Sequence, residues 1–240
     1  MRLKEFQYLA EGGNIFKSDA GPLTQRINRA DIAPTVKWLE AITGLPLANN
    51  MLGSVGKKDS SGDLDLAVDQ THTSKDQLVK QLTDWAVKNK KDPKQYVKKS
   101  GISVHFLTAI RGKEANGFVQ TDFMFGDNLE HMKFGLFAAG DASRFSGADR
   151  NLLMSSIAKQ LGLKVGANGM FSRASNELIS QDPDYVAKTI LGSKATRADL
   201  GNVESIYAFL AKDKDREAKL RDFREYLAKE GLKEPTQLEE

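Results

Sequence analysis

The sequence predicts an α/β (α+β) fold with a small mixed or antiparallel sheet, flanking helices and a second, small α+β domain. Some segments carry apolar residues at helical spacing, others alternate apolar and polar residues, and the two kinds follow one another along the chain. The chain has 240 residues, of which 40% are hydrophobic and 28% charged. This length and composition suit one domain with a buried core and a smaller companion.

Composition excludes several classes of protein. Cysteine is absent, which excludes a disulfide framework, a thiolate zinc site and a cysteine nucleophile. Charges at Lys4 and Glu5 stand where a signal peptide would be apolar, and no apolar run approaches membrane-spanning length. We therefore expect a cytoplasmic protein with no membrane partner. The net charge of +3 is too small to indicate nucleic-acid binding by itself.

The chain is predicted to begin with an arm over residues 1–30, followed by a first domain over 31–143. The breaks Gly12-Gly13 and Gly21-Pro22 interrupt the arm. The first helix of the domain is expected to begin with Asp31 as N-cap and to end at Gly44. A short strand is then predicted at 47–52, a strand at 63–68, a helix at 75–88, and strands at 102–110 and 117–125 joined by a turn at 112–116.

The sequence pattern changes after Gly140, and residues 144–240 are predicted to form the second domain. Its elements are a helix over 149–161, a hairpin turning at Asn168-Gly169, and two helical segments over 183–192 and 203–232. Asn202 is the expected N-cap of the last segment.

Three aspartates form the predicted metal site. Asp63 and Asp65 are two residues apart on a predicted strand, so both side chains project to the same face. Adjacent carboxylates repel each other unless a cation lies between them, and oxygen ligands favour Mg²⁺ or Mn²⁺. Asp122 is polar within an apolar predicted strand and is the expected third ligand. Three carboxylates can hold two ions. The alternative is that these are solvent-facing acids at strand ends.

A phosphate group is expected beside this strand. Gly53 and Ser54 offer backbone N–H groups and a hydroxyl, and Lys57 or Lys58 adds a cation. The segment is not a P-loop, because Met51 replaces the leading glycine and Lys58 replaces the metal-binding hydroxyl. Kinase and ATPase functions are thereby excluded. The sequence assigns no role to the three histidines.

A lysine-rich run over residues 88–99 is the one strongly basic segment. Two interpretations remain open for it: a contact surface for nucleic-acid phosphates, or a solvated helix and loop surface. Its lysines are Lys88, Lys90, Lys91, Lys94, Lys98 and Lys99.

Together, Gly53-Ser54, Gly62-Asp63-Leu64-Asp65 and the later Asp122 resemble the signature of the DNA polymerase β-like nucleotidyltransferase superfamily. The segments Phe145-Ser146-Gly147, Asn151 and 162–171 resemble the thumb of family X polymerases. The resemblance implies a nucleotidyltransferase palm over 31–143 and a thumb-like domain with C-terminal helices over 144–240.

The resemblance also implies roles for these residues. Asp63, Asp65 and Asp122 would be the catalytic ligands of two Mg²⁺ ions, for which Mn²⁺ can substitute. Gly53, Ser54, Lys57, Lys58 and Gly62 would bind the triphosphate of an NTP or dNTP. Phe145 and Gly147 would lie against the sugar of this nucleotide, and Asn151 would reach the edge of its base.

These features predict an enzyme that transfers a nucleoside monophosphate to a hydroxyl and releases pyrophosphate. The expected acceptor is the 3′-hydroxyl of DNA or RNA. Two alternatives stay open: transfer to a hydroxyl of a protein or small molecule, and a non-catalytic module that binds nucleic acid.

Overall fold

The computed structural model describes residues 15–235, and the chain divides into two compact units on either side of the Leu129–Glu130 bond. This boundary precedes the one predicted between residues 143 and 144. Residues 1–14 of the predicted arm lie outside the described part. The rest of that arm belongs to the first unit, because Phe16 and Ile27 are buried in its core. No helix within residues 15–235 combines the length and the apolar character needed to cross a bilayer.

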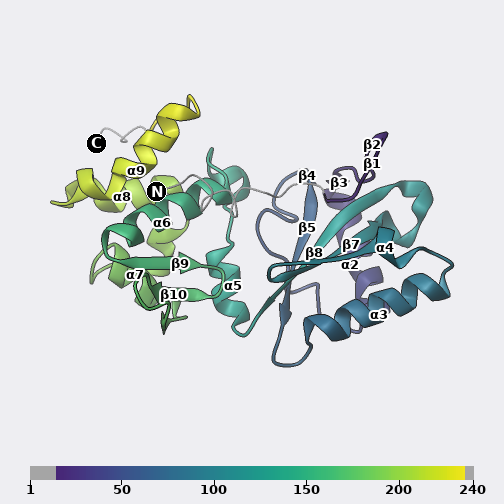
Figure 1. Cartoon of the computed structure of the whole chain (residues 1–240). Coiled ribbons are helices and arrows are strands. Elements are labelled where there is room, and N and C mark those ends of the chain that lie inside the picture. The colour runs from purple at the N-terminus through teal and green to yellow at the C-terminus, as the bar shows by residue number, and fades with distance from the viewer. Residues whose placement is uncertain (1–14, 236–240) are drawn as a thin grey trace. The chain divides into compact units, whose positions relative to one another are not determined.

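The first unit is built around a four-stranded mixed sheet with the order β5-β8-β7-β6 (Figure 1). Strand β5 pairs in parallel with β8, and the other two pairings are antiparallel. The elements in chain order are β1 (Lys17–Ser18), β2 (Gly21–Pro22), β3 (Ile27–Asn28), α2 (Arg29–Thr43), β4 (Ser60–Ser61), β5 (Asp63–Asp69), α3 (Lys75–Lys88), α4 (Pro93–Tyr96), β6 (Val97–Ser100), β7 (Ser103–Ala109), the 3₁₀ helices η1 (Ile110–Gly112) and η2 (Glu114–Asn116), and β8 (Phe118–Gly126).

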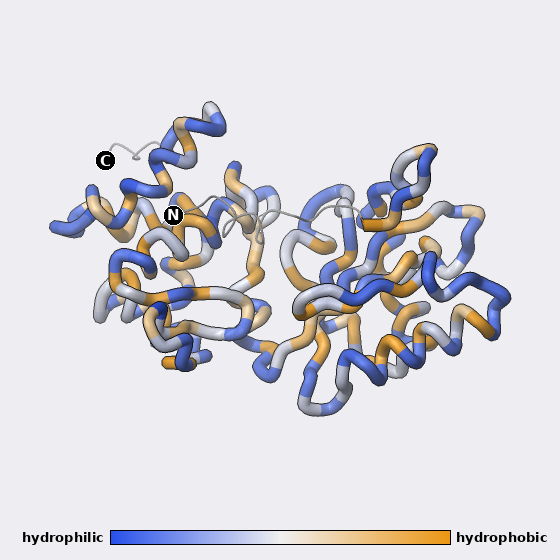
Figure 2. Tube along the Cα trace, viewed as in Figure 1, coloured by the Kyte–Doolittle hydropathy of each residue, from blue (hydrophilic) through white to orange (hydrophobic). Residues whose placement is uncertain are grey.

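Helices α2 and α3 pack on one face of this sheet. Apolar and polar stretches alternate along α3, as expected for a helix with one buried face (Figure 2). Trp38 of α2 and Trp85 of α3 contact each other and Phe106 of β7, with ring centroids 5.4–6.4 Å apart. Leu64 and Leu66 of β5 are fully buried in the same core. Residues between them on β5 therefore point to the opposite face of the sheet.

The strand at 63–68 and the helix at 75–88 are confirmed by β5 and α3, but two predicted elements of this unit differ from the structure. Helix α2 begins at Arg29 with Asn28 as N-cap, so Asp31 lies in its first turn. No strand forms over 47–52. Leu47 and Ala48 instead donate backbone hydrogen bonds to the Glu40 carboxylate. The segment touches the sheet through an isolated bridge between Met51 and Leu66.

The second unit combines helices with a three-stranded antiparallel sheet of order β11-β10-β9. Its core gathers apolar residues of α6 and of the C-terminal helices, including Ile157 and Phe223. The elements are α5 (Leu129–Gly135), which begins at the boundary, η3 (Gly140–Ala142), α6 (Gly147–Gln160), β9 (Leu163–Gly166), β10 (Gly169–Ser172), β11 (Leu178–Ser180), α7 (Pro183–Ile190), η4 (Arg197–Leu200), α8 (Val203–Phe209), η5 (Leu210–Lys212) and α9 (Arg216–Lys229).

Three predictions for this unit are corrected in detail. Helix α6 begins two residues before Asp149, because Ser146 and Asp149 form a capping box. In the hairpin Gly166 pairs with Gly169, so the turn residues are Ala167 and Asn168, one position earlier than predicted. The segment 203–232 is two helices rather than one. They are separated by a bend near Asp213, while Asn202 caps the first of them as expected.

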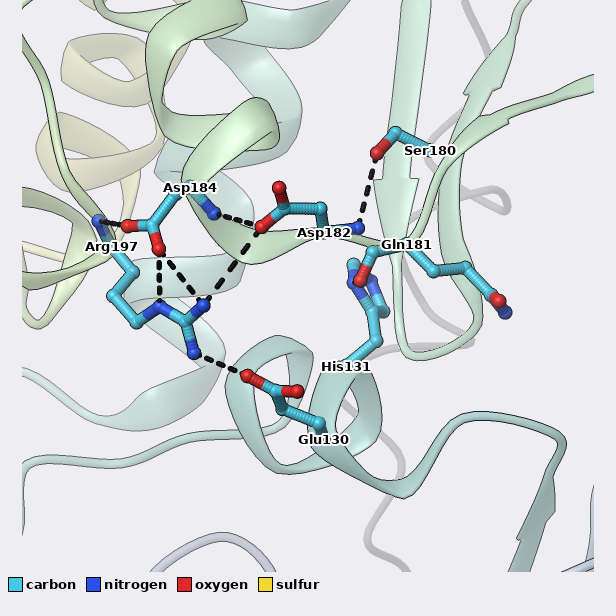
Figure 3. Close-up of polar contacts among 7 residues, drawn as sticks. All are labelled: Glu130, His131, Ser180, Gln181, Asp182, Asp184 and Arg197. Atoms are coloured by element: carbon cyan, nitrogen blue, oxygen red, sulfur yellow. Dashed lines mark hydrogen bonds and ion pairs between the residues drawn. The ribbon is translucent and has the colours of Figure 1, made fainter.

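A cluster of polar contacts ties α5 to the segments around α7 (Figure 3). The Arg197 guanidinium forms ion pairs with Glu130 at 2.6 Å and Asp184 at 2.9 Å. His131 is fully buried, and its Nδ1 lies 3.0 Å from the Gln181 carbonyl oxygen while its Nε2 lies 2.9 Å from that of Gly166. These contacts hold α5 against the small sheet.

Candidate metal centre

The three predicted aspartates converge on the face of the sheet opposite to that on which α2 and α3 pack. Asp63 and Asp65 are on β5, and Asp122 lies directly opposite Asp65 on the parallel neighbour β8. Each offers a carboxylate oxygen, and these atoms all lie within 4.8 Å of one another. The alternation of β5 and the parallel register together produce this cluster.

The electrostatics of the cluster favour a bound cation. Burial, together with the charge of Asp122, raises the pKa of Asp63 to about 6. Burial and the charges of Asp63 and Asp122 raise the pKa of Asp65 well above its usual range. Three carboxylates this close repel one another in the metal-free protein. An all-oxygen donor set of this kind fits a hard divalent ion such as Mg²⁺ or Mn²⁺.

Asp122 is held by two side chains that the sequence did not single out. His105 Nδ1 lies 2.8 Å from one carboxylate oxygen of Asp122, and Gln120 Nε2 donates to the other at 3.1 Å. Ser100 Oγ lies 2.7 Å from His105 Nε2. Residues that orient a ligating carboxylate from behind are typical of metal sites. The predicted strands at 102–110 and 117–125 contained the signal for His105, because pairing residue 110 with residue 117 places residue 105 opposite 122.

The loop with Gly53 and Ser54 runs beside the outer edge of β5. Leu52 N donates to Asp65 O at 2.9 Å, on the side of β5 away from β8. Gly53 has a φ of 58°, in the left-handed region that glycine adopts readily. Lys57 and Lys58 are exposed at the end of this loop. Gly62 is exposed immediately before Asp63. Gly53 thus directly follows a residue bonded to Asp65, and Gly62 directly precedes Asp63, while Lys57 and Lys58 lie farther along the same loop.

The remaining predicted nucleotide-binding residues, Phe145, Gly147 and Asn151, belong to the second unit. Phe145 is buried against Phe223 in the core of that unit, with ring centroids 6.4 Å apart. A Cβ at Gly147 would lie 2.9 Å from Cβ of Ala138, so close packing alone explains this glycine. The Asn151 side chain accepts a hydrogen bond from Arg150 at 3.0 Å. Phe145 and Gly147 thus have packing roles within the unit, and Asn151 has a hydrogen-bonding one.

The lysine-rich run is divided among several elements rather than forming one surface of free charges. Lys88 ends α3, Lys90 follows it, and Lys94 lies in α4. Three other lysines have partners. Lys91 pairs with Glu114 at 2.5 Å, Lys99 pairs with Asp76, and Lys98 donates to the Ile15 carbonyl oxygen at 2.5 Å. Lys98 and Lys99 lie on strand β6, whereas the sequence predicts no strand in this run.

Comparison of the sequence with protein-family models finds no match, and a search of curated proteins finds none either. The aspartate geometry and the motif residues around it are thus the grounds for assigning a function.

Proposed function

We propose that this chain is a metal-dependent nucleotidyltransferase of the DNA polymerase β-like kind, with its first unit as the palm. Its reaction transfers a nucleoside monophosphate from an NTP or dNTP to the 3′-hydroxyl of a nucleic acid. The convergence of Asp63, Asp65 and Asp122 carries this proposal. These are the residues of the motif that resembles the superfamily, and within residues 15–235 burial and the charges of Asp63 and Asp122 all raise the pKa of Asp65.

The reaction forms a bond between the acceptor oxygen and the α-phosphorus, and it breaks the bond from that phosphorus to pyrophosphate. Bound Mg²⁺ ions would lower the pKa of the acceptor hydroxyl and neutralise charge on the triphosphate. The chain itself supplies the carboxylates that hold the ions. His105 and Gln120 fix the orientation of Asp122 through the two oxygens of its carboxylate.

The loop beside β5 provides the donors for the triphosphate. Backbone N–H groups at Gly53 and Ser54, together with the Ser54 hydroxyl, suit phosphate oxygens. Lys57 or Lys58 adds a positive charge at the exposed end of the same loop. Because this loop is bonded to Asp65 through Leu52, a phosphate held there lies beside the carboxylates.

The test pairs metal binding with nucleotide transfer. We expect Asp65→Asn to abolish extension of labelled DNA or RNA oligonucleotides by NTPs or dNTPs in Mg²⁺ or Mn²⁺. The same change should weaken Mn²⁺ binding by at least about tenfold, because it removes a charged ligand with little change in volume. Mn²⁺ binding is followed by its electron paramagnetic resonance signal, and extension on a gel.

Asp84→Asn is the matched control. Asp84 lies on α3, is largely exposed and pairs only with Lys80 at 2.6 Å among the described residues. The Asp84→Asn variant should bind Mn²⁺ and extend oligonucleotides as the parent does. Full activity in Asp65→Asn would refute the assignment of the site. Metal binding without extension of any oligonucleotide would instead direct the search to a protein or small-molecule acceptor.

A further inference from the structure

A second set of polar side chains surrounds a cavity of about 610 Å³ at the end of the sheet where β8 begins. Its polar groups come from Gln25, Arg26, Asn28, Arg111, Lys113 and Asn116. Gln25 N donates to Phe118 O at 2.8 Å, which fixes the wall of the cavity to the first residue of β8. The volume falls within the range of about 300–1,000 Å³ that is typical of ligand sites.

The charge of this cavity is predominantly positive. Arg26, Arg111 and Lys113 line it, against one carboxylate, that of Asp31. Arg111 uses its Nε to pair with Asp31 at 2.5 Å. Lys113 is exposed and makes no ion pair within residues 15–235. Guanidinium, ammonium and amide groups at one site are the donors that bind phosphate oxygens.

The backbone holds Arg111 in place before any ligand arrives. Its φ is 56° and its ψ 25°, an uncommon conformation for a residue other than glycine. Arg111 N donates to Thr35 Oγ1 at 2.9 Å. The following residue, Gly112, packs so tightly that a Cβ there would lie 2.5 Å from Cδ1 of Trp38. With its backbone held in this way and its Nε paired with Asp31, Arg111 loses less freedom on binding an anion than an unrestrained arginine does.

Arg26 connects the cavity to the aspartate cluster. Its Nε and Nη2 donate to Ser60 at 3.0 and 2.9 Å, and its charge acts on Asp63. Its Nη1 lies 3.5 Å from the position that a Cβ on Gly62 would take. The Gly53–Ser54 loop is bonded to β5 along the edge away from β8. The cavity thus reaches the aspartate cluster at Asp63 through Arg26, and the Gly53–Ser54 loop reaches it at Asp65 through Leu52.

We propose that this cavity binds the phosphodiester backbone of the acceptor strand. The inference rests on the proposed function, and it assigns the acceptor to this side of Asp63 and the triphosphate to the Gly53–Ser54 side. With an acceptor on one side and a nucleotide on the other, the hydroxyl and the α-phosphorus meet at the carboxylates. Lys113, Arg111 and Arg26 are then specificity residues for a phosphate-bearing acceptor.

The test uses Lys113→Gln in the full chain, with Lys94→Gln as matched control. Both lysines are exposed, and neither forms an ion pair with a described residue. Binding of a fluorescein-labelled single-stranded oligonucleotide is followed by anisotropy across a salt series. We expect Lys113→Gln to lower the affinity several-fold and to reduce the slope of log affinity against log salt by about 0.7, the value for one lost phosphate contact on a single strand. Lys94→Gln should change neither quantity.

Separate arms distinguish failure of this inference from failure of the proposed function. Mn²⁺ binding and the affinity for ATP should be unchanged in Lys113→Gln. Loss of ATP affinity with unchanged oligonucleotide binding would assign the cavity to the triphosphate and overturn the inference. Weaker oligonucleotide binding in Lys94→Gln alone would move the acceptor to the lysine-rich run, while the proposed function would stand. If the parent protein binds Mn²⁺ but neither binds nor extends an oligonucleotide, both the inference and the nucleic-acid acceptor fail.

Discussion

At the scale of single residues, the aspartate cluster favours cation binding at the expense of stability. Asp63 has a pKa of about 6 in the folded, metal-free protein, compared with 3.8 for the free side chain. The folded state therefore holds the proton more tightly than the unfolded chain does. Stability from this group is fully present below pH 3.8 and is lost as the pH rises through about 6.

Because the ionised Asp63 carboxylate destabilises the folded protein at high pH, we expect Asp63→Asn to be stabilising there. In EDTA at pH 8 the variant should unfold with a free energy higher than that of the parent by up to about 3 kcal/mol, because the difference between the two pKa values corresponds to that energy. Urea unfolding at pH 4 and pH 8 measures the effect. The gain should shrink at pH 4, where the parent carboxyl is largely protonated in the folded state.

With divalent metal bound, the parent should become more stable than Asp63→Asn. Saturating Mg²⁺ stabilises the parent by filling the site, whereas Asp63→Asn lacks one of its charged ligands. Asp84→Asn again serves as control and should show no gain in EDTA. A variant that is no more stable than the parent at pH 8 without metal would show that neither burial nor the charge of Asp122 penalises the ionised Asp63 carboxylate in the folded protein.

At the scale of elements, helix α3 is defined by its first turn. Ser74 accepts a hydrogen bond from Gln77 N, and the Gln77 side chain accepts one from Ser74 N. Ser74→Ala removes the first of these, and we expect it to lower the free energy of unfolding by about 1 kcal/mol. Ser74→Asp restores an N-cap acceptor and should recover most of the loss. Urea unfolding of both variants checks this, and equal losses would locate the role of Ser74 outside the cap.

Elements with a local signal could be predicted from the sequence, and those set by long-range partners could not. Strand β5 and helix α3 have clear alternation or spacing, and they were placed within one residue. The segment 47–52 has the pattern of a strand, but the backbone N–H groups of its first two residues, Leu47 and Ala48, donate to Glu40 instead of to a neighbouring strand. Strand β6 was missed because its pairing partner, β7, and not its own lysine-rich sequence, defines it.

The distinction between local signals and long-range partners also applies to the aspartate site. Asp63 and Asp65 were paired by strand alternation, which is local. Asp122 was placed by its polar character within an apolar run, and its position opposite Asp65 depends on the parallel pairing of β5 with β8. The predicted hairpin places His105 opposite Asp122, although the sequence assigns it no role. Arg26 reaches the cluster only through tertiary contacts, so the sequence contains no signal for it.

At the scale of the whole molecule, the two units have separate hydrophobic cores. One core joins α2, α3 and the four-stranded sheet, and the other joins α6 to the C-terminal helices. The aspartates lie on strands of the first core. A change that loosens the second core should therefore leave the metal site intact.

Ile157→Ala tests this separation, because Ile157 is fully buried in the second core. We expect the second unit to lose about 2–5 kcal/mol of stability, and Ile157→Val to lose about 0.5–1.5 kcal/mol. Hydrogen exchange read peptide by peptide should show faster exchange in α6, with β5 and β8 unchanged. Mn²⁺ affinity should equal that of the parent in both variants. A Mn²⁺ affinity that falls slightly in Ile157→Val and further in Ile157→Ala, in step with the loss of stability, would mean that the site depends on the second unit. If the two cores are separate, loosening the second one does not affect the carboxylates.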